Sequence, residues 1–111
     1  MPVPLNPAPL HILVALAAED LHGYGIMQAI KRQSQGAYKL GPGTLYDNLK
    51  KLMDQNLVVN VPQAEQNQNE TRRLYRLTAD GRATLTAEIL RLESVISDAR
   101  PHLSKRRPKK A

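Results

Sequence analysis

The sequence predicts a mainly α-helical fold with a small β-hairpin, and three observations lead to this prediction. Apolar residues recur with helical periodicity in four segments of the 111-residue chain. Two short segments rich in β-branched or alternating apolar residues flank a polar run at residues 63–70, as the strands of a hairpin would. The last helical segment carries heptad spacing, which is typical of a helix that packs along a partner helix. A chain of this length supports one small domain with a modest core.

The first two predicted helices differ in how much of their surface is apolar. Residues 10–18 are apolar on almost every side, so we expect other elements to cover this helix on more than one face. Four prolines in front of it predict an extended N-terminal arm over residues 1–9. The second helix is predicted from about His22 to Gln33, and its short connection to Pro42 is the kind that a helix-turn-helix needs.

A third helix is predicted from Pro42 to Asp54, because proline fits the first turn of a helix. One face of it is a leucine stripe, Leu45, Leu49 and Leu52. The opposite face is small, hydroxyl-bearing or charged, and consists of Gly43, Thr44, Asp47, Lys50 and Lys51. Such a helix suits a DNA groove, and its N-terminal N–H groups would favour a phosphate near Gly43 and Thr44. An ordinary amphipathic surface helix would show the same stripe, so the next elements decide between the two interpretations.

The segments after the third helix predict a β-hairpin and a capped helix. Asn56 can close the third helix in the left-handed conformation, and strands are predicted at residues 57–61 and 72–77. Thr78 is expected to cap the following helix. The predicted order is a helix, then a hairpin with a long polar tip and a basic second strand, then another helix. This is the order of a winged helix-turn-helix. We assign this domain to residues 10–78.

The last predicted helix runs from Ala79 to about Ala99 and carries a seam of Leu85, Ile89, Leu92 and Ile96. A helix of roughly 20 residues is about 30 Å long and would project past a small domain. We therefore favour a dimerisation helix at residues 79–100 over a helix that packs only on its own domain. Pro101 disfavours helical geometry in the residue before it and so predicts the helix end, and residues 101–111 are expected to be a basic disordered tail.

Three motifs in this chain resemble those of the PadR-like bacterial transcriptional regulators. The motifs are LHGYGI at residues 21–26, GPGTLY at 41–46 and RLYRLTADG at 73–81, and the resemblance covers roughly residues 10–92. It implies a dimeric winged-helix repressor, often released from DNA by a small molecule, in which Tyr46 contacts a phosphate. Many members carry proline after this tyrosine, whereas this chain carries Asp47. A carboxylate there either accepts a hydrogen bond from cytosine N4 or repels DNA, and the sequence leaves both alternatives open.

We expect a homodimeric regulator, most simply a repressor, that binds a pseudo-palindromic operator in double-stranded DNA. Arg72 and Arg73 are assigned to the DNA backbone. The complete set of expected DNA-binding residues is Lys39, Gly43, Thr44, Tyr46, Asp47, Lys50, Lys51, Arg72 and Arg73. The alternative is a winged-helix protein–protein interaction module without specific DNA binding.

The distribution of charge bears on these alternatives. The net charge is +6, but the last seven residues hold five of the sixteen Lys and Arg. Residues 1–104 therefore carry eleven basic and ten acidic residues, a net charge of +1. This near neutrality supports a protein-binding module, whereas the basic cluster around the third helix and the hairpin supports DNA binding.

Composition argues against most other functions. The absence of cysteine excludes disulfides and thiolate metal sites, and the three histidines lack the spacing of a helical metal site. The serines have no recognisable base near them in sequence, so we expect no enzyme activity and no cofactor or metal. No apolar run reaches the ~20 residues of a membrane span and no charged leader begins the chain, so we expect a cytoplasmic protein with no membrane partner. The sequence names no effector, and the lack of Phe and Trp makes any effector pocket aliphatic.

A few side chains receive individual predictions. Tyr24 and Tyr75 are expected in or near the core, with their hydroxyls at its edge. Tyr46 should lie at the margin of the leucine stripe. Glu88 and Glu93 are expected to be solvated, and His11 is expected to reach solvent or a carbonyl group.

Overall fold

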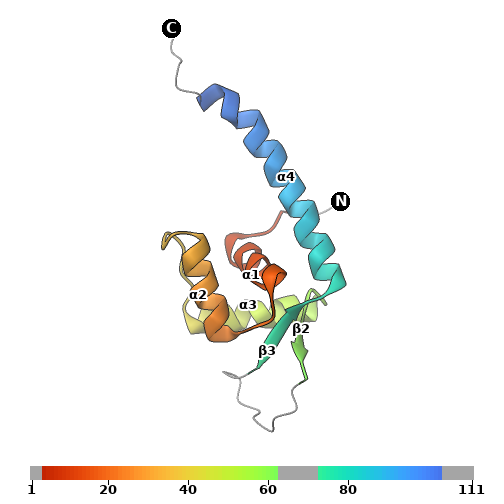
Figure 1. Cartoon of the computed structure of the whole chain (residues 1–111). Helices are drawn as coiled ribbons and strands as arrows, with labels where there is room; N and C mark the ends of the chain where they lie inside the picture. The colour runs from red at the N-terminus through yellow and green to blue at the C-terminus, as the bar shows by residue number, and fades with distance from the viewer. Residues whose placement is uncertain (1–3, 63–72, 104–111) are drawn as a thin grey trace.

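The computed structural model describes residues 4–62 and 73–103, which form four helices and three short strands (Figure 1). The elements in chain order are α1 (Pro7–Ala18), β1 (Leu21–His22), α2 (Gly23–Gln33), α3 (Pro42–Asp54), β2 (Val58–Val61), β3 (Leu74–Leu77) and α4 (Ala79–Leu103). This is the mainly helical, winged helix-turn-helix architecture that the sequence predicts, with the C-terminal helix added.

The sheet has one strand more than predicted. Its order is β1-β3-β2, with both pairs antiparallel. Leu21 pairs with Tyr75 and His22 pairs with Leu74, so the two residues of β1 lie along the free edge of β3. Two residues directly in front of a helix show no strand periodicity, which is why the sequence predicts only the β2–β3 hairpin.

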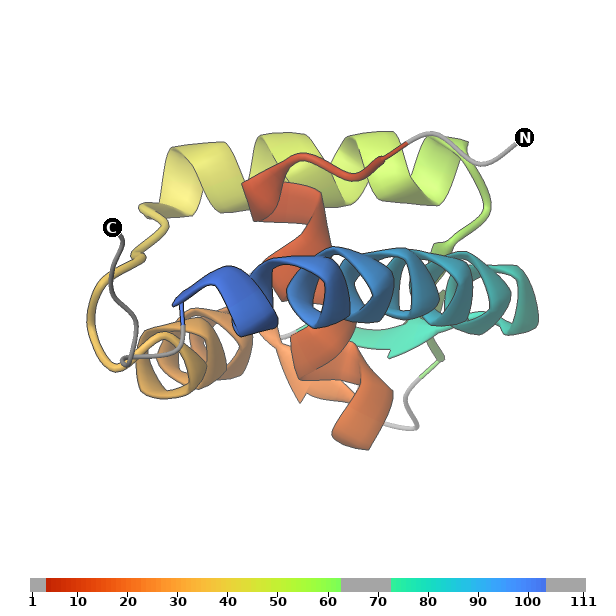
Figure 2. The same ribbon diagram turned by 90° about the horizontal axis from the view of Figure 1, so that it is seen from above.

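Helix α1 lies at the centre of the molecule. Its residues Ile12, Leu13 and Leu16 are buried, and the helix contacts α2, α3, α4 and β3. Figure 2 shows α1 crossing beneath α4, with α3 on one side. The prediction that this helix is covered on several faces agrees with these contacts. In the described part of the chain no helix is both long and apolar enough to cross a membrane.

Helix α1 begins three residues earlier than predicted, so the extended arm does not reach residue 9. Pro7 is at the start of the helix and Pro9 lies within its first turn. The first N–H groups of a helix have no acceptor within the helix, so prolines in this turn remove no hydrogen bond. The proline-rich composition therefore allowed either an arm or a helix start.

The ends of α2 and α3 agree with the prediction. Gly36 adopts φ 80° after α2, and its N–H donates to the Lys31 carbonyl at 2.8 Å. Asn56 adopts φ 63° after α3, and the next N–H, that of Leu57, donates to the Leu52 carbonyl at 2.9 Å. Both helices thus end in left-handed residues that satisfy otherwise unpaired carbonyl groups.

The junction between β3 and α4 is tightly packed. The Thr78 hydroxyl accepts a hydrogen bond from the Gly81 N–H at 2.8 Å and donates to the Asn56 carbonyl at 2.7 Å. The predicted Thr78 cap is therefore confirmed, and it also holds the start of α4 to the end of α3. Gly81 packs directly on the Leu57 carbonyl, where a Cβ atom would collide with the oxygen.

Helix α4 continues past Pro101 to Leu103, so the prediction that the proline ends the helix was wrong. Proline removes its own N–H bond and crowds the carbonyl four residues before it. Because Pro101 stands in the last turn, this cost is confined to one turn and the chain keeps its helical path. The 25 residues of α4 span about 37 Å at 1.5 Å per residue. Figure 1 shows its second half projecting away from the rest of the molecule.

Glu88 is buried rather than solvated, with 4% of its surface exposed. Its carboxylate accepts hydrogen bonds from Arg91 Nε at 2.9 Å and Arg91 Nη2 at 2.7 Å. It also accepts one from the Leu5 backbone N–H at 3.1 Å. The bonds from Arg91 are the main cause that lowers the pKa of Glu88, and burial opposes them. This carboxylate therefore ties the N-terminal segment to α4.

The Glu88→Gln variant should lower the melting temperature at neutral pH, because the charged acceptor of these bonds is lost. The pKa of Glu88 is lowered in the folded state, so its stabilisation is complete above its ordinary value of 4.5 and disappears as pH falls below that value. The difference in melting temperature between the two proteins should therefore shrink below about pH 4.5. Glu93→Gln, at an exposed position of the same helix, is the control, and an equal effect of both changes would contradict this role of Glu88.

The two tyrosines predicted for the core have different environments. Tyr75 on β3 is 1% exposed, as predicted, whereas Tyr24 on α2 is 68% exposed, so its prediction was wrong. Ile26 and Ile30 of α2 face the core. Tyr24 precedes Ile26 by two residues, about 200° around the helix, and therefore points to solvent.

Candidate nucleic-acid interface

The outward face of α3 is the centre of the candidate interface. Leu45, Leu49 and Leu52 are at most 2% exposed and anchor the helix on the core, as the leucine stripe predicts. All five predicted residues of the opposite face are exposed, and they are Gly43, Thr44, Asp47, Lys50 and Lys51. The helix therefore presents to solvent the face that the sequence assigns to DNA.

The N-terminal end of α3 is open to the approach of another molecule. Gly41 is the N-cap residue, and among the described residues no side chain caps the helix. A Cβ atom built on Gly41 or on Gly43 would meet no described atom within 4 Å. The Thr44 carbonyl accepts a hydrogen bond from Asn48 Nδ2 at 2.9 Å. The first N–H groups of α3 are thus accessible at its positive end, which suits a phosphate.

The charges on α3 are paired within the helix. Lys51 Nζ lies 3.5 Å from Asp47 Oδ2, and Lys50 Nζ lies 3.8 Å from Asp54 Oδ2. All four side chains are well exposed, so each pair contributes at most about 1 kcal/mol to folding. The two lysines can therefore leave their aspartate partners and bind DNA with little loss of folding free energy. The outward face nevertheless carries no excess of positive charge.

Tyr46 joins α3 to the start of α2. Its side chain is half-buried against the core, at the margin of the leucine stripe as predicted. Its hydroxyl lies against Gly23, where a Cβ atom would collide with it. A larger residue at position 23 would therefore displace the Tyr46 ring. The contact of Tyr46 with a phosphate stays a prediction.

The base of the wing is held by His22, for which the sequence predicts only a place at the start of the second helix. His22 Nδ1 lies 3.0 Å from the carbonyl oxygen of Arg73 and donates to it in the tautomer that protonates Nδ1. Arg73 is exposed just before β3, while Arg72 lies outside the described residues. The contact joins residues 51 positions apart, so no local pattern in the sequence could have indicated it.

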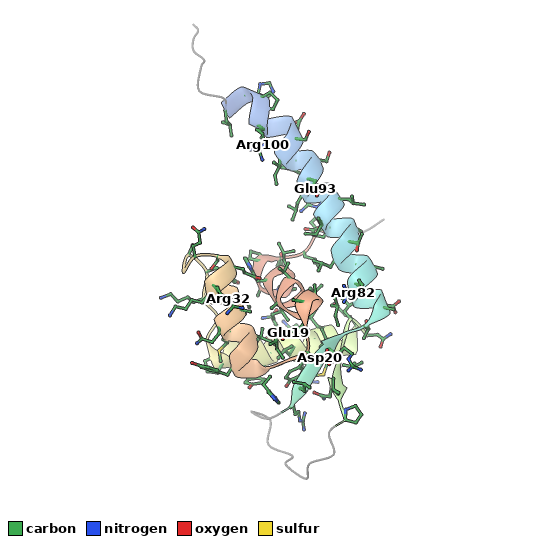
Figure 3. The ribbon with its side chains drawn as sticks, viewed as in Figure 1. Glu19, Asp20, Arg32, Arg82, Glu93 and Arg100 are labelled. Atoms are coloured by element: carbon green, nitrogen blue, oxygen red, sulfur yellow. The ribbon has the colours of Figure 1, made fainter. Side chains whose placement is uncertain are left out.

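Arg76, three residues after Arg73, is already engaged within the chain. Its Nη2 and Nε donate to Asp20 Oδ2 at 2.9 and 3.1 Å. The hydrogen bond with Asp20 raises the pKa of Arg76. Figure 3 shows Asp20 between α1 and the sheet, at the end of the molecule from which β2 and β3 extend. Arg76 thus joins β3 to the segment after α1 through Asp20. Arg73, in contrast, is exposed at the edge where the wing begins.

The turn between α2 and α3 carries Lys39, which is exposed as a DNA contact would need to be. The neighbouring Tyr38 ring stacks on His11 of α1, with centroids 4.7 Å apart and planes inclined by 21°. The Tyr38 N–H also donates to Ser34 Oγ at 3.0 Å. His11 was expected to reach solvent or a carbonyl, but its ring instead helps to hold this turn.

The predicted seam of α4 divides into two parts. Leu85 is 7% exposed and belongs to the core of its own chain. This position therefore agrees with the alternative prediction, a helix that packs on its own domain. Further along, Ile89 and Ile96 are 37% and 48% exposed, and Leu92 between them is half-buried. Leu90, Val95 and Leu103 add more exposed apolar surface. Figure 3 shows Glu93 and Arg100 on the projecting half of α4, beyond the other described elements.

Comparison with known proteins places this architecture in a family. The model of the transcriptional regulator PadR-like family matches residues 12–87. The transcriptional regulator Rv3488 of Mycobacterium tuberculosis is 36% identical over 86 residues, which cover 78% of this chain and 76% of that protein. The transcriptional regulator YqjI of Escherichia coli is 41% identical over 49 residues, which cover 44% of this chain and 24% of that protein.

Solved structures show the same fold. A PadR family regulator from Clostridium difficile has a TM-score of 0.72 at 23% identity, covering 89% of this chain and 100% of that one. Bacillus subtilis PadR in complex with operator DNA has a TM-score of 0.66 at 20% identity, covering 96% of this chain and 52% of that one. Together with the match over residues 12–87, these similarities show that the chain belongs to the PadR-like family of DNA-binding transcriptional regulators.

Proposed function

We propose that this protein is a cytoplasmic repressor that binds a pseudo-palindromic operator as a homodimer. One observation carries the proposal. The wing strands lie at the opposite end of the molecule from the projecting half of α4, and α3 lies at the wing end (Figure 1). A DNA-binding end and a separate pairing element are what a two-fold symmetric regulator needs.

In the proposed complex, α3 enters the major groove and the wing lies along the backbone. Thr44 and Tyr46 position the helix on phosphates, and Asp47, Lys50 and Lys51 face the base edges. The open N-terminus of α3 at Gly43 and the exposure of Lys39 support additional phosphate contacts. Arg73, together with Arg72, holds the backbone beside the wing. Two-fold symmetry then places the half-sites about one helical turn apart.

Dimerisation is proposed to use the exposed apolar side chains of α4. Ile89, Leu92 and Ile96 follow heptad spacing, and Ala99 and Leu103 continue it to the end of the helix. Such a narrow seam suits a partner helix. Exposed apolar side chains along half of a 25-residue helix also support a role in pairing, since they are otherwise left in water.

The second candidate function, protein binding without specific DNA binding, is favoured by the balanced charge of the α3 face. A mobility-shift titration with the DNA upstream of the protein's own coding sequence, against random duplex competitor, distinguishes the two. A repressor of its own operon should form a competitor-resistant complex, and footprinting should show two symmetric protected half-sites. Binding no stronger than to random DNA, on this and on a selected duplex library, would favour the protein-binding module.

The Arg73→Ala variant should bind operator and random DNA more weakly to the same extent, because a phosphate contact carries no sequence information. Loss of one phosphate contact should flatten the slope of log K against log salt by about 0.9 per chain. Fluorescence anisotropy over a salt series measures this slope.

Arg76→Ala is the matched control, since Arg76 is the same residue type three positions away and is paired with Asp20. Its slope should equal that of the wild type. A change of base preference in the Arg73→Ala variant would instead assign Arg73 to the bases.

A further inference from the structure

We infer that Asp47 is a specificity-determining residue that accepts a hydrogen bond from the N4 amino group of a cytosine in each operator half-site. The inference rests on the proposed function, since it requires α3 to enter the major groove.

The position of Asp47 on α3 suits contact with a base. It is the sixth residue of the helix, in its N-terminal half, and N-terminal residues of recognition helices are those that contact base edges. Leu45 and Leu49, which flank it in sequence, are at most 1% exposed and hold this part of the helix on the core. The Asp47 side chain is 65% exposed on the opposite face. Its carboxylate is therefore carried outward by a firmly packed helix.

The pairing of Asp47 with Lys51 argues against a purely repulsive role. The ammonium group lies 3.5 Å from the carboxylate and offsets its charge, so the pair as a whole repels a phosphate only weakly. An exposed pair of this kind is also easily opened. When DNA approaches, Lys51 can exchange the carboxylate for an acceptor on a base edge, and Asp47 then requires a new donor.

The chemistry of the major groove identifies that donor. Guanine presents two acceptors and thymine a carbonyl and a methyl group, none of which can donate to a carboxylate. Adenine presents a donor beside an acceptor, a pattern that an amide matches and a carboxylate does not. Cytosine presents its N4 amino group as a donor, and this is the base that a carboxylate fits.

Asp54 provides an internal comparison. It is also an exposed aspartate of α3 and is also paired with a lysine, Lys50, at 3.8 Å. It is the last residue of the helix, however, at the end away from the base-contacting turns. The Asp54→Asn change therefore tests how a negative charge on this face affects DNA affinity, while the proposed contact of Asp47 with a base is kept.

The test is a complete single-base substitution series of the operator, measured with wild type and with the Asp47→Asn, Asp47→Ala and Asp54→Asn variants. The wild type should prefer cytosine at one position of each half-site by about fivefold or more. Asp47→Asn should shift that preference towards adenine, which an amide matches, and Asp47→Ala should abolish it. Preferences at all other positions should remain, and Asp54→Asn should keep the cytosine preference.

Two outcomes would overturn the inference. If Asp47→Ala raised affinity for every operator variant alike and kept all base preferences, Asp47 would act by repulsion alone. If Asp47→Ala changed neither affinity nor preference, the carboxylate would serve only the surface pair with Lys51. If the wild type preferred no duplex over any other, the proposed function itself would be overturned. This result is distinguishable from failure of the Asp47 inference, because it is seen with the wild type alone, before any variant is compared.

Discussion

Replacement of both Ile89 and Ile96 by Asp is expected to convert the proposed dimer into a monomer and to abolish operator binding. These side chains are 37% and 48% exposed in the single chain, so the change should leave the fold intact. In the proposed interface it would bury unpaired carboxylates on both chains, at a cost of about 3 kcal/mol or more. A monomer engages one half-site at a time, so operator affinity should fall by about 100-fold or more. Sedimentation equilibrium measures the first effect and fluorescence anisotropy the second.

The control for this experiment is Ser94→Asp, an exposed position on the face of α4 opposite to Ile96. This variant should remain dimeric and bind the operator. Circular dichroism should show the same helical content for both variants, which separates dissociation from unfolding. If the double variant stayed dimeric, the assignment of Ile89 and Ile96 to the interface would be wrong.

The Gly81→Ala variant is expected to lose a large part of the stability of the fold. The new Cβ would collide with the Leu57 carbonyl oxygen and would stand 2.8 Å from Leu77 Cδ1. That oxygen cannot withdraw freely, because it accepts the Thr78 N–H at 3.0 Å. Overpacking of this kind costs about 3 kcal/mol, while alanine returns about 1 kcal/mol through its higher helix propensity. The net loss of about 2 kcal/mol should lower the melting temperature by about 10 °C.

Gly43→Ala is the matched control, because a Cβ there meets no described atom within 4 Å. Its melting temperature should stay equal to or slightly above that of the wild type, since alanine restricts the unfolded chain more than glycine does. Equal melting temperatures for the two alanine variants would show that the β2–α4 junction relaxes around the new methyl group.

The sequence by itself determined the elements whose signals lie within a few residues of one another. The leucine stripe and Pro42 predicted α3 from Pro42 to Asp54, and the structure has the same bounds. The left-handed Asn56 and the Thr78 cap were also predictable, because both depend on backbone groups within a few residues. The three motifs indicated the family for the same reason, since each is a short contiguous segment.

The candidate site was predictable only in part. The exposed face of α3 follows from helical periodicity, and all of its predicted residues are exposed. The pairing of Asp47 with Lys51 and of Lys50 with Asp54 obeys the four-residue spacing of helical neighbours, so this feature was available from the sequence. The contact of His22 with the Arg73 carbonyl was not, because it depends on how β1 meets β3.

Only the tertiary structure decided the environments that depend on distant segments. Glu88 has the sequence context of a solvated helix residue, yet the N-terminal segment covers it and donates the Leu5 N–H. Tyr24 lies in an apolar motif, yet the inward face of α2 is already occupied by Ile26 and Ile30. Leu85 has the spacing of the α4 seam, yet it packs into the core of its own chain. Local patterns determine which faces of a helix are apolar, and burial depends on which other elements reach those faces.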